Sequence, residues 1–309
     1  MRVGPARAGR RSAAPPQRGL IVPDIPLWSW QLIGALILNG FVQMAAVGAF
    51  AARIAGVSTK RIAISISLFS LFATASRLAN MFYAPLLGTI SDRTGNLVTA
   101  AIHAGSATLA APQVAQFEFQ LRLIVFAGTI GTLVGAMFLP TFEYLFVRGI
   151  GSFQRLDSVP NALMRMFDPR VLSDVVHSFR FPRPAHWSQY KLASVPAKLL
   201  FWNTVLYAVY SIGVVAAVYA SVREPALART ATLLSGIVNG IGTVAFTLFV
   251  DPTAANIVDS AVHGKRTIED VRSMVFWLTV TMVLGTLLSQ LLLYPATLVI
   301  DVAARLVHR

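Results

Sequence analysis

Residues 123–147 read LIVFAGTIGTLVGAMFLPTFEYLFV and contain one charged residue, Glu143. A helix of about 20 mostly apolar residues crosses the hydrocarbon core of a bilayer, so this run is long enough to span a membrane. Five other runs have the same character, at about residues 27–52, 62–90, 199–222, 230–250 and 273–300. The sequence therefore predicts an all-α, polytopic integral membrane protein with about six transmembrane helices.

The composition agrees with a membrane protein. Hydrophobic residues make up 55% of the 309 and charged residues 13%, and the mean hydropathy is +0.65. Soluble domains have about 25% charged residues. A soluble enzyme, a secreted disulfide scaffold and a disordered protein are therefore excluded. The chain has no cysteine, and its five histidines lack the spacing of metal ligands, so we expect no thiolate or metal site.

Positive charge dominates the ionised residues, with 26 Lys and Arg against 13 Asp and Glu. These basic residues lie mainly in the N-terminal tail and in the loops between apolar runs. There, positive charge sets membrane orientation and contacts anionic lipid headgroups. We therefore expect membrane lipids, and no nucleic acid, as partners. Lys and Arg are more numerous in the loops after the first, third and fifth spans, which favours a cytoplasmic location for these loops.

The predicted organisation alternates membrane spans with polar segments. It comprises a disordered basic, Pro- and Ala-rich tail (1–24), spans one to three (25–147), a long basic loop (148–198), spans four to six (199–303) and a C-terminal tail (304–309).

Two connections have features of their own. Residues 96–116, between the second and third spans, are rich in Ala, Gly and Ser. This weakly hydrophobic stretch could be a re-entrant or interfacial segment, or a seventh span. Before the sixth span, Thr267 and Asp270 have the spacing of a capping box and predict a helix start.

Arg77 lies near the middle of the second span. A guanidinium at the bilayer centre costs at least about 2.5–3.5 kcal/mol, so it needs a partner or a wet cavity. Asn80 follows on the same helix face, and Pro85 is expected to disrupt the helix. The functional interpretation is a cavity that binds an anionic headgroup. The structural alternatives are an ion pair with Glu143 or an arginine close to the membrane interface.

Three more charged residues are candidates for the same site. Glu143 follows Pro140 and could pair with Arg77, relay a proton or reach the interface at the end of its span. Arg53 and Arg122 close the first span and open the third. They resemble interfacial anchors, but they would also suit a phosphate-binding vestibule, because arginine binds phosphate through two parallel hydrogen bonds.

Small and polar residues within the spans predict close helix packing. Gly131 with Gly135, and Gly236 with Gly240, form GxxxG motifs that allow helix backbones to approach closely. Several amide side chains within the spans are expected to form hydrogen bonds across helices or to line a cavity: Asn39, Gln43, Asn203, Asn239 and Gln290.

Motifs of catalysis and nucleotide binding are missing from the sequence. No GxxxxGK[ST] or GxGxxG loop is present to hold a nucleotide, and no HExxH, GxSxG or clustered acid pair indicates hydrolysis. We therefore expect neither an enzyme nor a cofactor.

Several segments, in the same order along the chain, resemble the Amj family. They are 53–63 (RIAGVSTKRIA), 67–69 (SLF), 76–88 (SRLANMFYAPLLG), 129–136 (TIGTLVGA) followed by 140–142 (PTF), and 285–292 (GTLLSQLL). The likeness covers about residues 40–300. Members of this family are bacterial membrane proteins proposed to flip lipid II, the undecaprenyl-pyrophosphate-linked precursor of peptidoglycan, as an alternate to the flippase MurJ.

The resemblance implies a flippase of the bacterial cytoplasmic membrane that works by alternating access. In this interpretation Arg77 binds the pyrophosphate, Arg53 and Arg122 act at the mouths of the cavity, and Asn80 and Gln43 contact sugar or peptide. The implied partners are lipid II or a related polyprenyl-pyrophosphate lipid, together with enzymes of cell-wall synthesis.

Other functions fit the same sequence. The chain could transport a different polyprenyl-linked glycan. It could also be a non-transporting assembly factor that uses the long basic loop as a docking surface. An enzyme acting on lipid-linked sugars is a third alternative, weakened by the missing acid cluster.

Overall fold

A computed structural model of the chain describes residues 26–153, 173 and 189–308. These residues form helices and no strands. They are α1 (Trp30–Thr59), α2 (Ile62–His103), η1 (Ala107–Ala110), α3 (Ala111–Phe153), η3 (Leu192–Ser194), α6 (Ala197–Tyr210), α7 (Gly213–Arg223), η4 (Pro225–Leu227), α8 (Ala228–Ala245), a π-helical turn η5 (Phe246–Val250), α9 (Asp251–Val262) and α10 (Ile268–His308). Six helical segments are long and apolar enough to cross a membrane. The predicted all-α membrane protein is confirmed.

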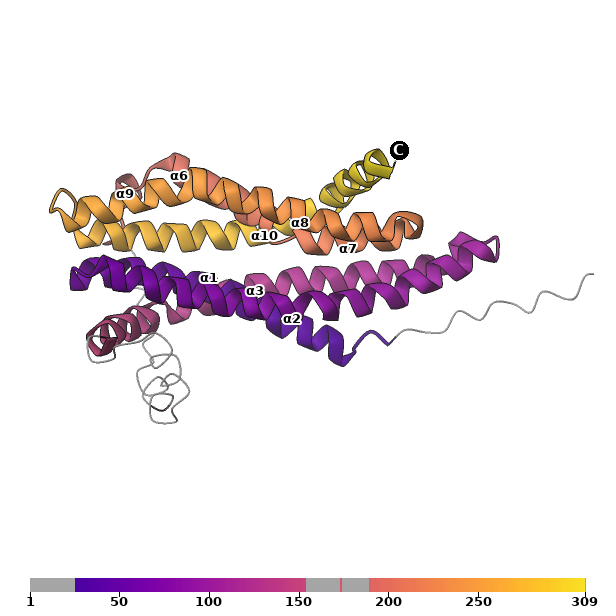
Figure 1. Cartoon of the computed structure of the whole chain (residues 1–309), viewed down its shortest axis with the longest axis horizontal. Helices are drawn as coiled ribbons and strands as arrows, with labels where there is room; N and C mark the ends of the chain where they lie inside the picture. Colours follow the sequence, from indigo (N-terminus) through magenta and orange to yellow (C-terminus); the bar gives the residue numbers. More distant parts are fainter. Residues whose placement is uncertain (1–25, 154–172, 174–188, 309) are drawn as a thin grey trace, which may run out of the picture.

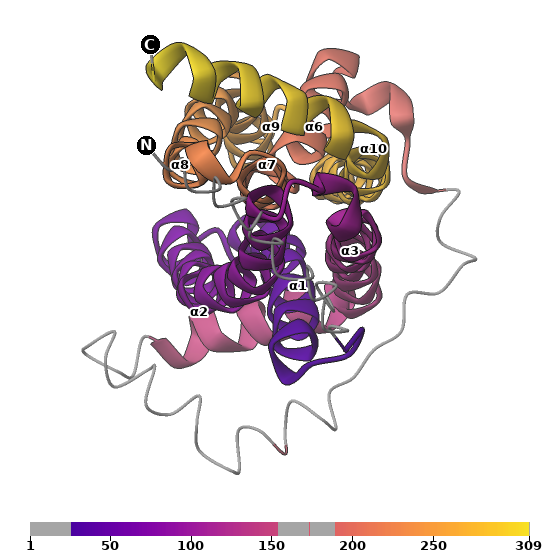
Figure 2. The same ribbon diagram turned by 90° about the vertical axis from the view of Figure 1, so that its right-hand side faces the viewer.

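The spans form two layers of three. Helices α1, α2 and α3 make one layer, and α6 to α10 make the other (Figure 1). Seen end-on, α2 lies below α8 on one side of the molecule and α3 lies below α10 on the other (Figure 2). The first layer is the N-terminal half of the chain and the second layer is the C-terminal half. Because the first half contains three spans, the second half enters the membrane from the side opposite to the first. The two halves therefore have inverted orientations, as in many secondary transporters.

The long helices extend well beyond a bilayer core. Helices α2, α3 and α10 contain 42, 43 and 41 residues. At ~1.5 Å per residue each is about 60 Å long, twice the ~30 Å of hydrocarbon. Residues 96–116, expected to be a re-entrant or interfacial segment or a seventh span, form the end of α2, the short helix η1 and the start of α3, and they add no span to the six.

Prolines lie inside three of these helices. Pro85 is within α2, Pro140 within α3 and Pro295 within α10. The prediction that Pro85 disrupts its helix is wrong, because α2 continues to His103. A proline removes one backbone donor, and membrane helices tolerate this loss when neighbouring groups bind the freed carbonyl. After their prolines α3 and α10 change direction (Figure 1), while Ile150 and Ala304 in these end segments stay buried.

Glycines on α3 bring it against α1. A Cβ atom at Gly131 would overlap the backbone of Gly40, and one at Gly135 would lie 2.8 Å from Val47. The predicted packing role of this GxxxG motif is confirmed. The same prediction is wrong for Gly236 and Gly240 on α8, where an added Cβ would meet nothing within 4 Å.

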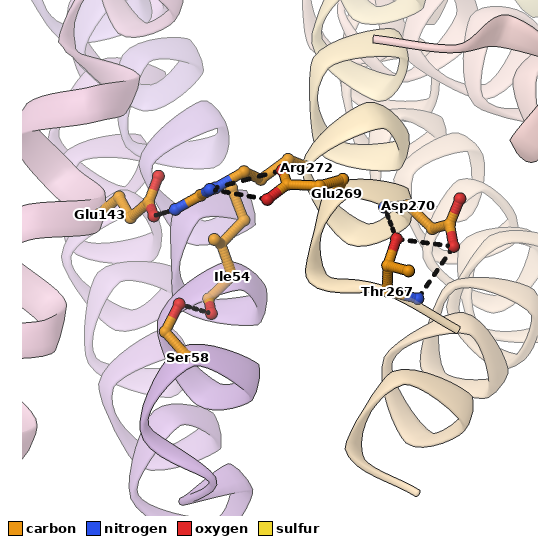
Figure 3. A network of polar contacts seen from close by, with 7 residues as sticks. All are labelled: Ile54, Ser58, Glu143, Thr267, Glu269, Asp270 and Arg272. Carbon is orange, nitrogen blue, oxygen red and sulfur yellow. Dashed lines mark hydrogen bonds and ion pairs between the residues drawn. The ribbon is translucent and has the colours of Figure 1, made fainter. Parts of the chain in front are cut away.

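Short connections join the spans at both ends of the bundle. At one end, called the Lys60 end, Lys60 takes a left-handed conformation with φ 56° between α1 and α2. At the same end the predicted capping box is confirmed, because the Asp270 carboxylate accepts the Thr267 amide at 2.9 Å and the Thr267 hydroxyl accepts the Asp270 amide at 3.2 Å (Figure 3). The opposite end, called the Gly105 end, carries the α2–α3 and α7–α8 connections.

Most of the predicted long loop, and the whole predicted N-terminal tail, lie outside the described residues. The last described part of the loop begins at residue 189, before α6. There Tyr190 stacks on Phe276 of α10, with ring centroids 4.6 Å apart, and its carbonyl accepts the indole N–H of Trp277 at 3.3 Å. Burial in this contact raises the pKa of the Tyr190 phenol.

Candidate functional site

A polar pocket lies at mid-height of the bundle, where the two layers meet. Four of the six spans contribute to it: α1 and α2 from the first half, the α6–α7 junction and α8 from the second. Its lining residues are Asn39, Val42, Gln43, Ser76, Arg77, Asn80, Tyr83, Tyr210, Ser211, Val214 and Asn239. The structure thus brings together three of the predicted site residues, Arg77, Asn80 and Gln43.

The fourth span is broken at the pocket. Helix α6 ends at Tyr210 and α7 begins at Gly213. Interrupted backbone at membrane depth occurs where it is buried in protein or lines a cavity. Gly213 permits a close approach to α8 here, since an added Cβ would lie 2.6 Å from the Asn239 side-chain oxygen. The break therefore places the Ser211 hydroxyl and Asn239 at the pocket wall.

Most of the buried polar side chains around the pocket bind other helices. Gln43, which is 3% exposed, donates its amide to the Ser211 hydroxyl at 3.1 Å and joins α1 to the α6–α7 junction. Asn39 donates to the carbonyl of Ile124 on α3 at 2.7 Å. Ser76 donates to the carbonyl of Val42 at 3.4 Å. These bonds fix the pocket wall, so Gln43 has a structural role in addition to lining the pocket.

Arg77 differs from these residues. Its side chain is exposed at the mouth of the pocket, and no other described residue forms a hydrogen bond or an ion pair with it. Its neighbours on the outer face of α2 are large and apolar, with Leu78 53%, Met81 68% and Phe82 65% exposed. An unpaired guanidinium among lipid-facing side chains raises the free energy of the protein in the membrane. An anion that comes from outside the chain would offset that cost.

The pocket is small in this structure. Its cavity volume is about 50 Å³, which is room for a few water molecules. A phosphorylated sugar headgroup is several times larger. Such a ligand can enter only when the helices around the pocket separate, or when it binds from the open side where Arg77 is exposed.

The other predicted charged residues lie away from Arg77 and are paired within the protein. Arg53 of α1 binds Asp251 of α9 at 3.1 Å. Arg122 binds Glu118 at 2.7 Å, and it also donates to the carbonyl of Gln290 on α10 at 3.0 Å. The structure therefore does not gather the arginines into one vestibule.

Glu143 forms no pair with Arg77. Its carboxylate accepts a hydrogen bond from Arg272 of α10 at 2.8 Å, and Arg272 also binds Glu269 at 3.3 Å (Figure 3). The part of α3 that carries Glu143 does contact α2, since the rings of Phe142 and Phe72 are 5.6 Å apart, but the ion pair formed by the Glu143 carboxylate is with Arg272. The alternative of an Arg77–Glu143 ion pair is therefore wrong, and Glu143 joins the two halves at the Lys60 end.

This pair gives a first testable expectation. Glu143→Gln keeps the side-chain shape but removes the negative charge that pairs with Arg272 across the two halves. We expect a loss of about 1 kcal/mol in the free energy of unfolding, because the pair is half-buried. Denaturant unfolding in detergent would measure it. Glu269→Gln is the control, since Glu269 is more exposed and lies on the same helix as Arg272. A larger cost for Glu269→Gln would contradict the cross-half role of Glu143.

Several pocket residues were not singled out from the sequence. Tyr83, Tyr210 and Ser211 line the pocket, and the only signal for the last two is the Ser-Ile-Gly sequence at 211–213 inside an apolar run.

The predicted role of the amide side chains within the spans is confirmed for Asn203, which donates to the Leu278 carbonyl at 2.9 Å, and for Gln290, which donates to the Arg122 carbonyl at 2.9 Å.

Over residues 26–153, 173 and 189–308, no three His, Asp or Glu side chains are grouped so that they could hold a metal ion.

Comparisons with known proteins agree with one another. A family model described as "Amj: Alternate to MurJ" matches residues 38–304. The protein "Lipid II flippase Amj" of Bacillus subtilis (strain 168) is 30% identical over 252 residues, which cover 80% of this chain and 87% of that relative. No solved structure matches this chain.

Proposed function

This chain belongs to the Amj family, and from that premise we propose that it moves lipid II across the bacterial cytoplasmic membrane. The relative in Bacillus subtilis is named for the same substrate. Lipid II has a pyrophosphate and a sugar-peptide headgroup on a polyprenyl chain. The charged headgroup does not cross hydrocarbon unaided, because burying a charge costs far more than thermal energy. The protein transports this lipid and does not alter it chemically.

One observation supports the proposal most directly. Arg77 is exposed at the mouth of a mid-membrane pocket, without a partner among the described residues. Its neighbour Asn80 also lines this pocket. In the proposed function the guanidinium binds the pyrophosphate through charge-assisted hydrogen bonds, and Asn80 binds the adjoining sugar. Arg53, Arg122 and Glu143 keep their internal partners and hold the helices together.

The two inverted halves suggest how the pocket opens. At the Lys60 end they are joined by Arg53 with Asp251 and by Glu143 with Arg272. At the Gly105 end Ser91 of α2 and Ser221 of α7 lie 3.1 Å apart, within hydrogen-bond distance. We propose that breaking the contacts at one end, while those at the other end hold, opens the pocket to one side of the membrane at a time. This is alternating access around a central site.

Restoration of lipid II transport in cells tests this function. Bacterial cells depleted of their native flippase would express this chain or an empty vector, and lipid II exposed on the outer leaflet would be measured. We expect exposure with the chain and none with the vector. Absence of exposure from a chain that accumulates in the membrane would contradict the proposal.

Purified protein distinguishes the substrate. Liposomes containing the chain would carry either lipid II or a polyprenyl pyrophosphate with a different glycan, and the rate of transfer between leaflets would be compared. Faster transfer of lipid II supports the proposal. Faster transfer of the other glycan favours a transporter of that lipid, and transfer of neither favours an assembly factor.

A further inference from the structure

The lipid-facing sides of α2 and α8 are chemically unusual. Elsewhere the outward faces of the bundle carry large apolar side chains, as on α10, where Leu284, Leu287 and Leu291 are exposed. This is the normal surface toward lipid tails. On α2 and α8, small and hydroxyl-bearing residues form a stripe beside the polar pocket.

On α2 the stripe follows the helical spacing through Arg77. It contains Ser70, Thr74, Ala84 and Gly88, interrupted by Met81. Ser70, Thr74 and Ala84 are exposed, and a Cβ added at Gly88 would meet nothing within 4 Å. The opposite side of α2, which includes the buried residue Leu87, packs into the protein. The stripe therefore borders the pocket on its open side.

On α8 and η5 the matching stripe is Thr232, Gly236, Gly240, Thr243 and Thr247. All five residues are exposed. They lie next to Asn239, which lines the pocket, while Leu234 and Gly242 face the interior. Helix α8 packs on α7 and α10, and α2 packs on α1, α3 and α7. Helices α2 and α8 do not form a packed pair over the described residues, although both line the same pocket and lie on the same side of the molecule (Figure 2).

The two stripes together cover most of the membrane thickness. From Ser70 to Gly88 the rise is about 27 Å, and from Thr232 to Thr247 it is about 22 Å, at ~1.5 Å per residue. The hydrocarbon core is ~30 Å thick. Arg77 lies within this length. The polar members of the stripes are Ser70, Thr74, Arg77, Thr232, Thr243 and Thr247, and the others are small residues and Met81. A binding site for an immobile lipid would not need small and polar residues along so many helical turns.

The hydroxyl groups are arranged to be tolerated in lipid. Thr74 donates to the Ser70 carbonyl at 2.8 Å, Thr243 to the Asn239 carbonyl at 2.9 Å and Thr247 to the Thr243 carbonyl at 3.1 Å. Their donors are thus satisfied within the helix, while each oxygen keeps acceptor capacity. Such a surface accepts hydrogen bonds from the hydroxyl and amide groups of a saccharide or peptide.

We propose that the space between these two stripes, the α2–α8 furrow, is the path along which the saccharide-peptide headgroup crosses the membrane. The hydrocarbon tail stays in the bilayer, against Phe82 of α2 and Ile237 of α8. Arg77 binds the phosphate as it passes the middle. This inference rests on the proposed function and adds the route. It also explains how a large headgroup moves past a pocket of only about 50 Å³.

Filling the furrow tests the route. The double variant Gly236→Leu/Gly240→Leu adds apolar bulk where an added Cβ has open space, so the fold is retained. Gly151→Leu is the matched control, since it makes the same change in open space at the end of α3. In liposomes containing fluorescent lipid II, we expect at least tenfold slower transfer for the double variant and less than twofold change for the control. Transfer by the double variant at the native rate would overturn the furrow.

A second measurement does not depend on lipid II. The chain has no cysteine, so single cysteines report local access to water. Thr243→Cys and Gly240→Cys should react with a membrane-impermeant thiol reagent at least tenfold faster than Leu233→Cys and Ile241→Cys on the lipid face. Equal rates would overturn the furrow, whatever the substrate. If the native chain fails to transfer lipid II but the furrow cysteines react quickly, the proposed substrate is wrong and the polar path remains.

Discussion

Arg77→Ala is expected to reduce lipid II transfer by at least about 30-fold. Removing one partner of a desolvated charge pair costs about 2–5 kcal/mol, and ~1.4 kcal/mol is a factor of ten. Arg77→Lys keeps the charge but loses the paired donors of the guanidinium, so we expect an intermediate rate. Transfer between the leaflets of liposomes, at equal protein content, measures the effect. Arg229→Ala is the matched control, because Arg229 is exposed and lies outside the pocket lining.

The stability of the Arg77→Ala variant should not fall, although its transfer rate does. An unpaired arginine at mid-membrane costs at least about 2.5–3.5 kcal/mol, so Arg77→Ala should unfold at the same temperature as the native chain or higher. A structural arginine would give the opposite result, since its removal would leave a partner unsatisfied. Thermal unfolding in detergent separates the two. Loss of transfer together with a lower unfolding temperature would contradict a substrate-binding role for Arg77.

The number and kind of spans were predictable from the sequence. Runs such as 123–147 are long and apolar enough to identify each membrane helix without knowledge of its neighbours. The capping box at Thr267 and Asp270 was predictable for the same reason, because both partners lie within one helical turn. Helix ends were less predictable, since α2 and α3 continue beyond the membrane as amphipathic helices.

The part of the pocket that comes from the α6–α7 junction was not predictable, although Asn239 of α8 was among the amides expected to line a cavity. Ser211 accepts the hydrogen bond from Gln43 because the fourth span is broken between α6 and α7 at this point. This arrangement depends on contacts between residues more than 160 positions apart. A local sequence pattern does not show which residues so far apart in the chain come into contact.

The partners of charged residues were equally hidden. Arg53 and Arg122 share the residue type and the near-terminal positions of interfacial anchors, and both were candidates for phosphate binding. In the folded chain Asp251 and Glu118 bind them. Arg77 remains without a partner among the described residues, and its mid-span position was the one feature that set it apart in the sequence.

Glycines with the same GxxxG spacing should respond in opposite ways to substitution. Gly131→Leu is expected to prevent folding or to cost at least about 3 kcal/mol, because even its Cβ would overlap the backbone of Gly40. Helices α1 and α3 would have to separate, and they would lose the close packing that holds membrane helices together. Accumulation in the membrane, followed by thermal unfolding of purified protein, measures this loss.

The control for this prediction is Gly236→Ala on α8. Its Cβ would meet no atom within 4 Å, and alanine favours a helix interior over glycine by roughly 0.5–1 kcal/mol. We therefore expect unchanged or slightly higher stability for Gly236→Ala. Equal losses at Gly131 and Gly236 would mean that α8 packs as tightly as α3. The space beside Gly236 would then be filled by protein, and the furrow between α2 and α8 would be closed.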